Sequence, residues 1–255
     1  MKISIIIINY QSAVFLKKCL ASIQKNFSGK EVEAIVVNND KNERVGLEKA
    51  SFPLKIIENR ENVGFARACN QAAKEAKGEY LFFLNPDAKI AGKDFYKIIR
   101  EFEQNPQIGA AGPGIIEEIT GKPQPWIGGG KTSLPKVLFK NTLNKHWNKK
   151  TKTKVDWVSG TALLTSKKIF NKLGGFDENF FMYFEDQDYC LRAKKLGLKI
   201  LFLPEFKVLH CGGKSWKSQK SQKKRYYISQ QVFFDKHMPL QAKILKILHK
   251  FILKL

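Results

Sequence analysis

Short apolar runs and polar turns alternate along the first part of the chain. Ile3–Ile8 is dominated by isoleucine, as expected for a strand buried on both faces. Ala34–Val37, Leu54–Ile57 and Tyr80–Leu84 are shorter runs of the same kind. Apolar residues at helical spacing predict three helices between and after these runs: one capped by Ser12 with an apolar face reaching Phe27, one over Gly64–Lys77 and one over Asp94–Gln104. This alternation predicts an α/β fold, a mostly parallel sheet with helices on both faces.

The pattern loosens after Gly112. Gly128–Gly130 and the lysine-rich segment up to Lys154 indicate a mobile loop or short helices. Regular spacing then returns, and it predicts helices over Ser166–Leu173 and Asp186–Leu196 and strands at Ile200–Leu203 and Lys207–Leu209.

The C-terminal segment Leu240–Leu255 predicts a basic amphipathic helix. One face carries only apolar residues and another only lysines: Leu240, Ile244, Ile247, Leu248, Phe251 and Leu255 against Lys243, Lys246, Lys250 and Lys254. Two interpretations stay open. The helix lies in a membrane interface, or its apolar face packs on the domain or on a dimer partner.

The formal net charge of +22 implies an anionic partner: a nucleic acid, an anionic membrane or a phosphorylated substrate. The basic residues are concentrated late in the 255-residue chain. The segment between Gly130 and Val155, for example, holds eight lysines and no acid. The four cysteines form no CxxC pair, which argues against zinc ribbons and redox motifs. The apolar start is too short for a signal peptide, and no apolar stretch reaches the roughly 18 residues that span a bilayer.

Polar clusters follow three of the predicted strands. They are Asn9-Tyr10, Asn38 to Asp40 and Asn85-Pro86-Asp87. Ligands of such sheets bind beyond the carboxyl ends of the strands, so these clusters are expected to converge. Asp87 could hold a divalent cation together with substrate phosphates, although an Asn-Pro-Asp turn with no further role is equally consistent with the sequence.

An acidic cluster follows an aromatic run in residues 180–188, FFMYFEDQD. Acids in the first turn of a helix are favoured by its dipole, which accounts for one or two of Glu185, Asp186 and Asp188. An apolar wall beside a carboxylate excludes water and raises the pKa of that carboxyl, which suits a general base. The aromatic run therefore favours a functional role.

Two further motifs are weaker. In the stretch Asn59–Asn70, Asn62 is expected to cap a helix, Gly64 to allow close approach, and Arg67 to share a helical face with Asn70. His210-Cys211-Gly212-Gly213 places a histidine and two glycines after a strand, which suits a metal ligand or a phosphate contact. A lone histidine is more often structural.

Taken together, these motifs resemble glycosyltransferase family 2, the inverting enzymes with a GT-A (Rossmann-like) fold. The resemblance covers about residues 3–216 and is nearest to the rhamnosyltransferase-like branch. It rests on the order and spacing of SIIIINYQS, NVGFARACNQAAKEAKGEYLFFLNPDA, VSGTALLTSKKIFNKLGGFDENFFMYFEDQDYCLRAKKLG and HCGGKS.

The resemblance implies a role for each motif. Asp87 and His210 would hold Mg²⁺ or Mn²⁺, and Asp186 would be the catalytic base. The donor site would comprise Asn9, Tyr10, Asn38, Asp40, Asn62, Gly64, Arg67 and Asn85. The acceptor site would comprise Asp156, Trp157, Gly160, Glu185 and Asp188. Residues 1–216 would form the glycosyltransferase domain, with a nucleotide-binding half over about 1–112 and an acceptor-binding half over about 113–216, followed by a basic helical extension over 217–255.

The implied reaction moves a sugar, possibly rhamnose, from a TDP- or UDP-linked donor to a glycan or lipid-linked acceptor in cell-surface polysaccharide synthesis. The protein would then sit in the cytoplasm at the anionic inner face of the cell membrane. Asn38 departs from the family, where Asp is usual. Three alternatives stay open. One is a nucleic-acid-binding protein, which the charge near Arg225 and Tyr226 motivates, and another is an inactive homologue that acts as a binding module. The third, a sugar nucleotidyltransferase, is disfavoured because no glycine-rich loop follows the first strand.

Overall fold

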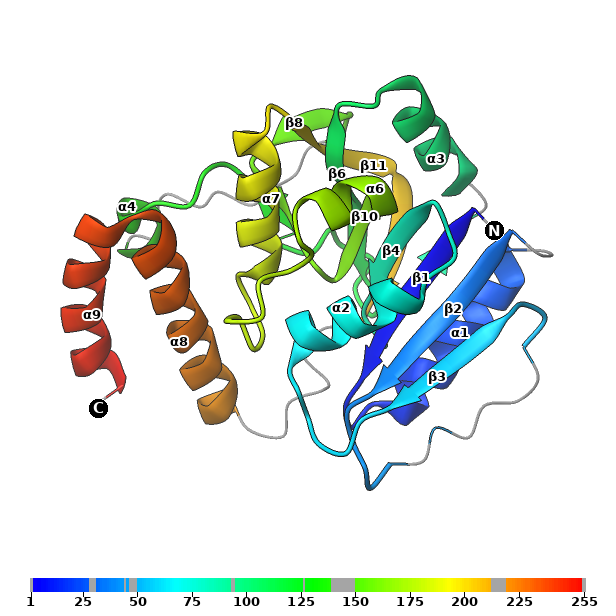
Figure 1. The fold of residues 1–255 in the computed structure, drawn as a ribbon, viewed down its shortest axis with the longest axis horizontal. Coiled ribbons are helices and arrows are strands. Elements are labelled where there is room, and N and C mark those ends of the chain that lie inside the picture. Colours follow the sequence, from blue (N-terminus) through cyan, green and yellow to red (C-terminus); the bar gives the residue numbers. More distant parts are fainter. Residues whose placement is uncertain are drawn as a thin grey trace.

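A nine-stranded sheet forms the centre of the molecule (Figure 1). The structure is a computed structural model that describes residues 2–27, 31–43, 45, 50–92, 95–125, 127–138, 150–211 and 219–253. The strand order is β3-β2-β1-β4-β10-β6-β11-β5, with β8 paired to β11 off this path. Asp94, Gly212, Gly213 and Leu255, which belong to the predicted motifs and helices, lie outside the described residues.

The first four strands of the chain form a parallel block. They are β1 (Ile3–Asn9), β2 (Val32–Asn38), β3 (Leu54–Glu58) and β4 (Tyr80–Leu84), all within a residue or two of the predicted runs. Ile3 is in register with Val32 of β2 and with Tyr80 of β4. The carboxyl ends of these strands therefore lie at one edge of the sheet.

The second block mixes directions. β10 (Ala162–Ser166) runs antiparallel to β4 and β6 (Ile108–Glu117), and β6 runs parallel to β11 (Lys199–His210). Four short strands complete the pairing. β5 (Ala88–Ala91) and β8 (Thr153–Val155) each run antiparallel to β11, and β7 (Gly128–Gly129) pairs with β9 (Trp157–Val158) in a separate sheet. The two predicted strands after Ile200 are one strand with a register shift between Leu203 and Lys207.

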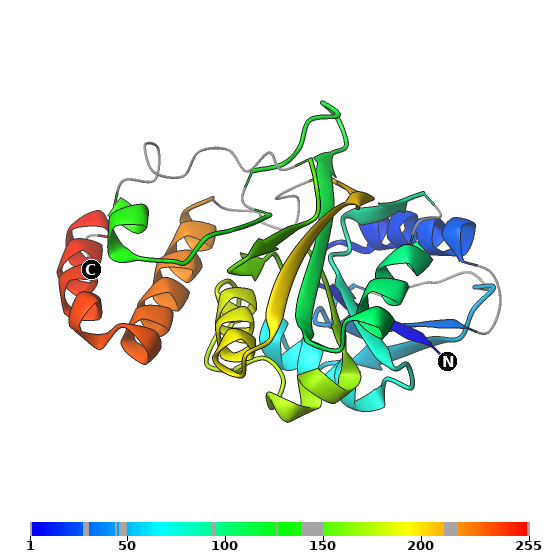
Figure 2. The same ribbon diagram turned by 90° about the horizontal axis from the view of Figure 1, so that it is seen from above.

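Helices cover both faces of the sheet (Figure 2). One face carries α1 (Ala13–Asn26) and α3 (Phe95–Gln104), and the other carries α2 (Phe65–Glu75), α6 (Lys167–Lys172) and α7 (Glu185–Lys195). Neighbouring residues of β4 point to opposite faces, as strand geometry requires. Phe82 accordingly packs on Phe95 of α3 at 5.1 Å between ring centroids, and Phe83 packs on Phe176 at 4.8 Å.

The chain ends in a helical hairpin, α8 (Gln219–His237) and α9 (Pro239–Leu253), beside α4 (Leu134–Leu138). This hairpin shares a second hydrophobic cluster with the aromatic run before α7. The fully enclosed members are Leu134, Phe180, Phe184, Phe233, Phe234, Ala242 and Leu245. The C-terminal helix is confirmed, and α8 lies in the remaining part of the segment 217–255 that was expected to be a helical extension.

Two predicted helix caps differ in detail. Ser12 precedes α1 as expected, but its hydroxyl donates to Asn9 Oδ1, and the Glu43 carboxylate accepts from the backbone N–H groups of Ser12 and Ala13 instead. The prediction that Asn62 caps α2 was wrong, because the N-cap residue is Gly64. Asn62 Oδ1 accepts from the Gly64 backbone N–H at 3.0 Å, so it fixes the turn before the helix.

Candidate active site

The strand-end clusters converge as predicted, and their amides bond mainly to one another. Asn9 Nδ2 donates to Asn38 Oδ1 and to Glu43 Oε2, each at 2.9 Å. Asn38 Nδ2 donates to the Glu58 carboxylate at 2.7 Å and to backbone carbonyls. Asn9 and Asn38 are buried, and their bonds are internal. They therefore hold the turn in place from beneath.

A small hollow opens above this network. It has a volume of about 90 Å³, and its lining includes Tyr10, Asn39, Asn62, Asn85 and Phe181. Tyr10 is 37% exposed, so its ring is free to meet a ligand. Asp40 is buried beside the turn, and Arg67 lies further out on α2, where it faces Glu178 at 3.8 Å. Asn39 lines the hollow, although nothing in the sequence pattern distinguished it from Asn38.

Asp87 and His210 meet at the end of the sheet. His210 Nε2 lies 3.1 Å from Asp87 Oδ1, and both side chains are nearly enclosed. His210 Nδ1 lies 2.7 Å from Gln124 Oε1, whose amide is oriented by a bond from Gln124 Nε2 to the His210 carbonyl oxygen. Nδ1 must therefore carry a hydrogen, which leaves the Nε2 lone pair of a neutral ring facing a carboxylate. That arrangement needs a cation between the two groups, either a proton or a metal.

A larger cavity of about 390 Å³ adjoins the hollow, and the two share Phe65, Asn85 and Met182. We call it the acceptor cavity. Its lining brings together segments that are far apart in the sequence: Lys136 and Val137 of α4, Trp157 to Thr161, the run Met182 to Gln187, and Tyr226 of α8.

Asp186 lies on the wall of the acceptor cavity, half-buried in the first turn of α7. Its Oδ2 accepts from the Gly160 backbone N–H at 2.8 Å, and its Oδ1 accepts from the Gln187 backbone N–H at 2.7 Å. Burial raises the pKa of the Asp186 carboxyl, and the two N–H bonds oppose that shift. The Asp186 carboxylate is thus fixed in orientation and partly shielded from water, as expected of a general base.

Glu185 is the second carboxyl on the cavity wall, and it is 5% exposed. Its Oε2 has no hydrogen-bond partner among the described residues. Burial, followed by the negative charge of Asp186 and then that of Asp188, holds the pKa of Glu185 well above its ordinary value. Of the two carboxyls, Glu185 therefore holds its proton more strongly than Asp186 does.

The backbone entering α7 is unusual. Tyr183 and Phe184 are consecutive residues with φ of 71° and 67°, in the left-handed region that residues other than glycine rarely adopt. Contacts from α8 hold them there: Gln222 Nε2 bonds to the Tyr183 hydroxyl at 3.0 Å, and Ser229 Oγ donates to the Met182 carbonyl at 2.6 Å. The strained turn thus depends on the C-terminal hairpin.

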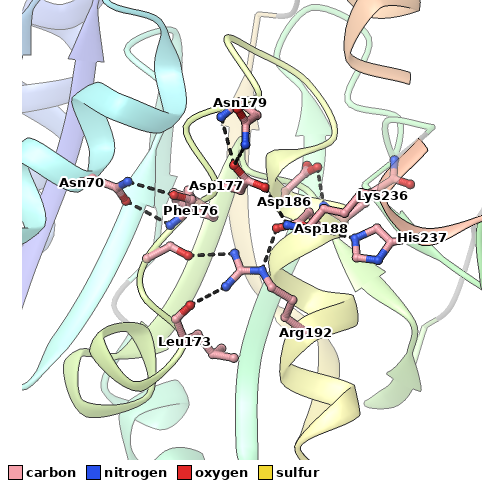
Figure 3. Close-up of polar contacts among 12 residues, drawn as sticks. Asn70, Leu173, Phe176, Asp177, Asn179, Asp186, Asp188, Arg192, Lys236 and His237 are labelled. Atoms are coloured by element: carbon pink, nitrogen blue, oxygen red, sulfur yellow. Dashed lines mark hydrogen bonds and ion pairs between the residues drawn. The ribbon is translucent and has the colours of Figure 1, made fainter. Parts of the chain in front are cut away.

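Asp188 does not line the acceptor cavity. It is fully buried, and it accepts from Arg192 Nε at 2.7 Å, Lys236 Nζ at 2.7 Å and His237 Nε2 at 2.8 Å (Figure 3). Lys236 also reaches Asp177 Oδ2 at 2.6 Å. This clamp ties the end of α8 to the first turns of α7, beside the proposed base. Asp156 is likewise engaged, with Lys194, outside the acceptor cavity.

A match to a family model identifies the protein family of this chain. The sequence model described as "Glycosyl transferase family 2" matches residues 4–174, more than half of the chain. The chain belongs to glycosyl transferase family 2. This confirms the resemblance read from the motifs.

Curated relatives of this family 2 glycosyltransferase include several rhamnosyltransferases. The N-acetylglucosaminyl-diphospho-decaprenol L-rhamnosyltransferase of Mycobacterium tuberculosis is 24% identical over 81% of this chain and 75% of its own length. Rhamnosyltransferase WbbL of Escherichia coli is 23% identical, with coverages of 81% and 82%. The dTDP-rhamnosyl transferase RfbF of Shigella flexneri is 26% identical, with coverages of 75% and 67%.

Solved structures share the fold. GalNAc-T7 with UDP, GalNAc and Mn²⁺ superposes with a TM-score of 0.64 at 17% identity, over 86% of this chain and 44% of that one. Mannosyltransferase PcManGT of Pyrobaculum calidifontis, with GDP-Man and Mn²⁺, gives 0.62 at 16% identity, over 98% and 69%. The GT-A fold predicted for this family 2 glycosyltransferase is confirmed. The nucleic-acid alternative gains no support: Arg225 stacks on the Phe181 ring at 4.3 Å and Tyr226 packs against Phe184 at 5.2 Å.

Proposed function

We propose that this enzyme transfers a sugar, rhamnose in the first instance, from a nucleoside-diphosphate donor to an acceptor hydroxyl with inversion at the anomeric carbon. One observation carries the proposal. The hollow and the acceptor cavity beside Asp186 share Phe65, Asn85 and Met182 as lining residues, so a donor and an acceptor bound in them would lie next to each other. The rhamnosyltransferase names of its relatives suggest the sugar and the polysaccharide context.

Asp186 is the proposed base. Its carboxylate takes the proton of the acceptor hydroxyl while the hydroxyl oxygen bonds to the anomeric carbon and the bond from that carbon to the diphosphate oxygen breaks. The raised pKa of the Asp186 carboxyl makes it a better proton acceptor, and its two backbone bonds keep it aimed at the cavity. Met182, Phe184 and Trp157 limit water access on the cavity wall.

Asp87 and His210 are the proposed metal ligands. Their facing oxygen and nitrogen fit a shared divalent cation, Mg²⁺ or Mn²⁺, and Gln124 supports the histidine as an outer-shell partner. No cluster of three or more His, Cys, Asp or Glu side chains suited to a metal exists in the described part of the chain, so the donor diphosphate and water would supply the other ligands. The cation would offset the negative charge on the diphosphate leaving group.

Tyr10, Asn62, Gly64 and Asn85 are the proposed direct donor contacts, since they line or border the hollow. Asn9, Asn38 and Asp40 are assigned the role of holding the turn, because their side chains are buried. Arg67 is the proposed phosphate contact: its side chain is 60% exposed on α2, and it would exchange its partner Glu178 for the diphosphate.

The exposed side of α9 extends the proposal to an anionic membrane at the cytoplasmic face. Leu240, Ile244 and Ile247 are 80%, 51% and 59% exposed, whereas Ala242 and Leu245 make the contacts with the domain. Within the described residues, the helices fall short of the length and apolar character that a bilayer crossing requires. Flotation with phosphatidylglycerol vesicles tests this: Ile244→Gln with Ile247→Gln should abolish it, and unchanged flotation would count against the membrane role.

A thermal-shift panel of nucleoside diphosphates and nucleotide sugars, with and without Mn²⁺, tests the enzymatic proposal. A ligand at a hundredfold excess over its Kd stabilises the folded state by about 2.7 kcal/mol. We expect Mn²⁺-dependent stabilisation by TDP or UDP compounds that is lost in Asp87→Asn and kept in the exposed control Asp235→Asn. No shift with any nucleotide would overturn the proposal, and nucleotide binding without turnover would identify a binding module.

A further inference from the structure

A second depression adjoins the acceptor cavity. It has a volume of about 270 Å³, and three residues line both depressions: Thr132, Trp157 and Gln187. We call this second depression the side pocket. Small-molecule sites in proteins begin at about 300 Å³, so the size of the side pocket suits a single sugar ring or a group of similar size.

His237 gives the side pocket a buried hydrogen-bonding atom without a partner. Its side chain is 4% exposed, and its Nε2 lies 2.8 Å from Asp188 Oδ1, as Figure 3 shows. A carboxylate oxygen only accepts, so Nε2 carries the hydrogen. Burial is the main cause that lowers the pKa of His237, which favours the neutral ring. Nδ1 of that ring is a lone-pair acceptor, and it has no partner among the described residues.

This unpaired acceptor indicates which kind of ligand group would complete the side pocket. Buried polar atoms are rarely left without a hydrogen bond. A lone pair is satisfied by an O–H or N–H group, whereas an ionised phosphate has no hydrogen to donate. Since Nε2 is engaged by Asp188, Nδ1 is the nitrogen of His237 that a ligand in the pocket would meet. The side pocket therefore favours a ligand that carries hydroxyl groups.

The other walls of the side pocket combine polar and apolar groups. Asp156 supplies a second acceptor, which is bonded to Lys194, and the exposed Lys195 supplies N–H donors. The apolar part of the wall is formed by Leu191, Phe233 and Met238. A sugar ring carries hydroxyl groups around its edge and C–H groups on its faces, so it matches both parts of the wall.

Trp157 stands between the two depressions, because it lines both. The face of an aromatic ring is negative, and the C–H groups of a sugar pack favourably against it. The Thr132 hydroxyl donates to Gln187 Oε1, which fixes the orientation of the Gln187 amide on the shared wall. Sugars bound in the acceptor cavity and in the side pocket would thus lie next to each other, on either side of Trp157.

We propose that the side pocket binds a second sugar of the acceptor, and that one hydroxyl of this sugar donates to His237 Nδ1. The terminal sugar, which receives the transferred one, would occupy the acceptor cavity beside Asp186. This inference rests on the proposed function and narrows it. The acceptor would carry at least two sugars, so an earlier glycosyl transfer must have supplied it.

A glycan array tests the side pocket without donor or metal. Glucose, galactose, mannose, rhamnose and N-acetylglucosamine are each printed beside neutral disaccharides that end in them and beside the uronic-acid counterparts of those disaccharides. Binding of the labelled full-length chain is measured over a concentration series in EDTA.

The variant is His237→Gln, whose amide N–H can still donate to Asp188 but which lacks the ring nitrogen Nδ1. The matched control is His249→Gln, because His249 is also buried and bonds Gln230 through Nε2, away from the side pocket.

We expect the wild type to bind at least one neutral disaccharide more tightly than the monosaccharide in which it ends. One hydrogen bond of ordinary strength corresponds to about two- to tenfold in affinity, so His237→Gln should lose about that much for the disaccharide. Its affinity for the monosaccharide should stay at the wild-type value, and His249→Gln should match the wild type for both.

Three results would overturn the proposal. Disaccharides that bind no better than their terminal monosaccharides, or do not bind at all, would exclude a second sugar site. Equal losses for both kinds of glycan in His237→Gln would reduce the effect to a disturbed structure. A preference for the acidic disaccharides that persists in His237→Gln would identify an anion site made by the lysines.

Histidine ¹⁵N spectra of the wild type give a readout that does not depend on the folding of a variant, because the chain has four histidines. The tightest-binding disaccharide of the array should shift the Nδ1 resonance of His237 and leave that of His249 unchanged. An unmoved His237 would contradict the proposal. Since the array and the spectra need neither donor nor metal, they can fail while nucleotide binding succeeds, and the reverse.

Discussion

The donor side and the acceptor side of the active site satisfy their buried polar groups differently. On the donor side, Asn9, Asn38, Glu43 and Glu58 bond to one another beneath the hollow. On the acceptor side, Glu185 Oε2 and His237 Nδ1 are buried without partners in the described residues. The donor side is therefore complete by itself, and the acceptor side has bonding capacity that awaits a ligand.

The two sides also differ in where their residues come from. The donor side gathers mainly the ends of neighbouring strands, with Phe181 and Met182 added from the aromatic run, whereas the acceptor side combines α4, α7 and α8. The comparison teaches that a sheet edge can be organised locally, while a pocket built from distant helices needs a clamp such as Asp188. Three changes, taken from the largest expected effect to the smallest, break or sharpen this contrast.

Asp186→Asn should separate the two sides most sharply. The amide cannot accept the hydroxyl proton, so turnover should fall by about 10² to 10⁴-fold. Nucleotide binding should stay within about twofold, because Asp186 lies on the acceptor side. Turnover is measured with a nucleotide sugar and binding by titration. A variant that loses nucleotide affinity would place Asp186 on the donor side instead.

Asp188→Asn should destabilise the acceptor side. It removes the carboxylate shared by the half-buried Arg192 and the exposed Lys236, while Lys236 keeps Asp177. Hydrogen bonds to charged groups contribute about 1.5–3 kcal/mol each, and a loss of that size is expected. The free energy of unfolding is measured in urea, with Asp235→Asn as the exposed control, expected within about 0.5 kcal/mol of wild type. A loss as small as that of the control would mean that the clamp does not hold the hairpin.

Glu185→Gln should change how stability depends on pH. The folded-state pKa of Glu185 is raised, so folding takes up a proton between the unfolded and folded pKa values, and wild-type stability falls as pH rises through that window. The slope is at most about 1.4 kcal/mol per pH unit for this one group. Glutamine removes this contribution, so the variant should gain stability over wild type as pH rises above the ordinary glutamate pKa, by at most that slope. Parallel curves would indicate an ionised Glu185.

The strands could be predicted from the sequence where the apolar pattern of buried residues and the strand propensity of those residues agree. The isoleucine-rich β1 and the aromatic β4 were found nearly to the residue. β6 was missed because its sequence, IGAAGPGIIE, has low strand propensity. Close packing explains those small residues: a Cβ on Gly112 would lie 2.7 Å from Val158 Cβ, and one on Gly109 would lie 2.9 Å from Ala193 Cβ.

The residues of the candidate site could be predicted from the sequence only in part. The carboxylates of Asp87 and Asp186 stand out by type and position. The structure places Asp186 on the wall of the acceptor cavity and Asp87 against His210. The support of α8 was hidden, because the residues on its packed face include Gln222, Arg225 and Ser229, which are polar. Asp188 is of the same residue type as Asp186, and sequence alone could not show that one faces a cavity and the other a buried arginine.

Gly64 bears on how this enzyme could be re-engineered. A Cβ on Gly64 would lie 2.7 Å from the Phe181 carbonyl oxygen, and that oxygen accepts from the Phe65 backbone N–H at 2.6 Å. The backbone of the donor half and that of the aromatic run thus touch without a side chain between them. Chimeras that exchange acceptor specificity between relatives must therefore transplant the loop at Gly64 together with the segment at Phe181, because neither tolerates a partner of different shape.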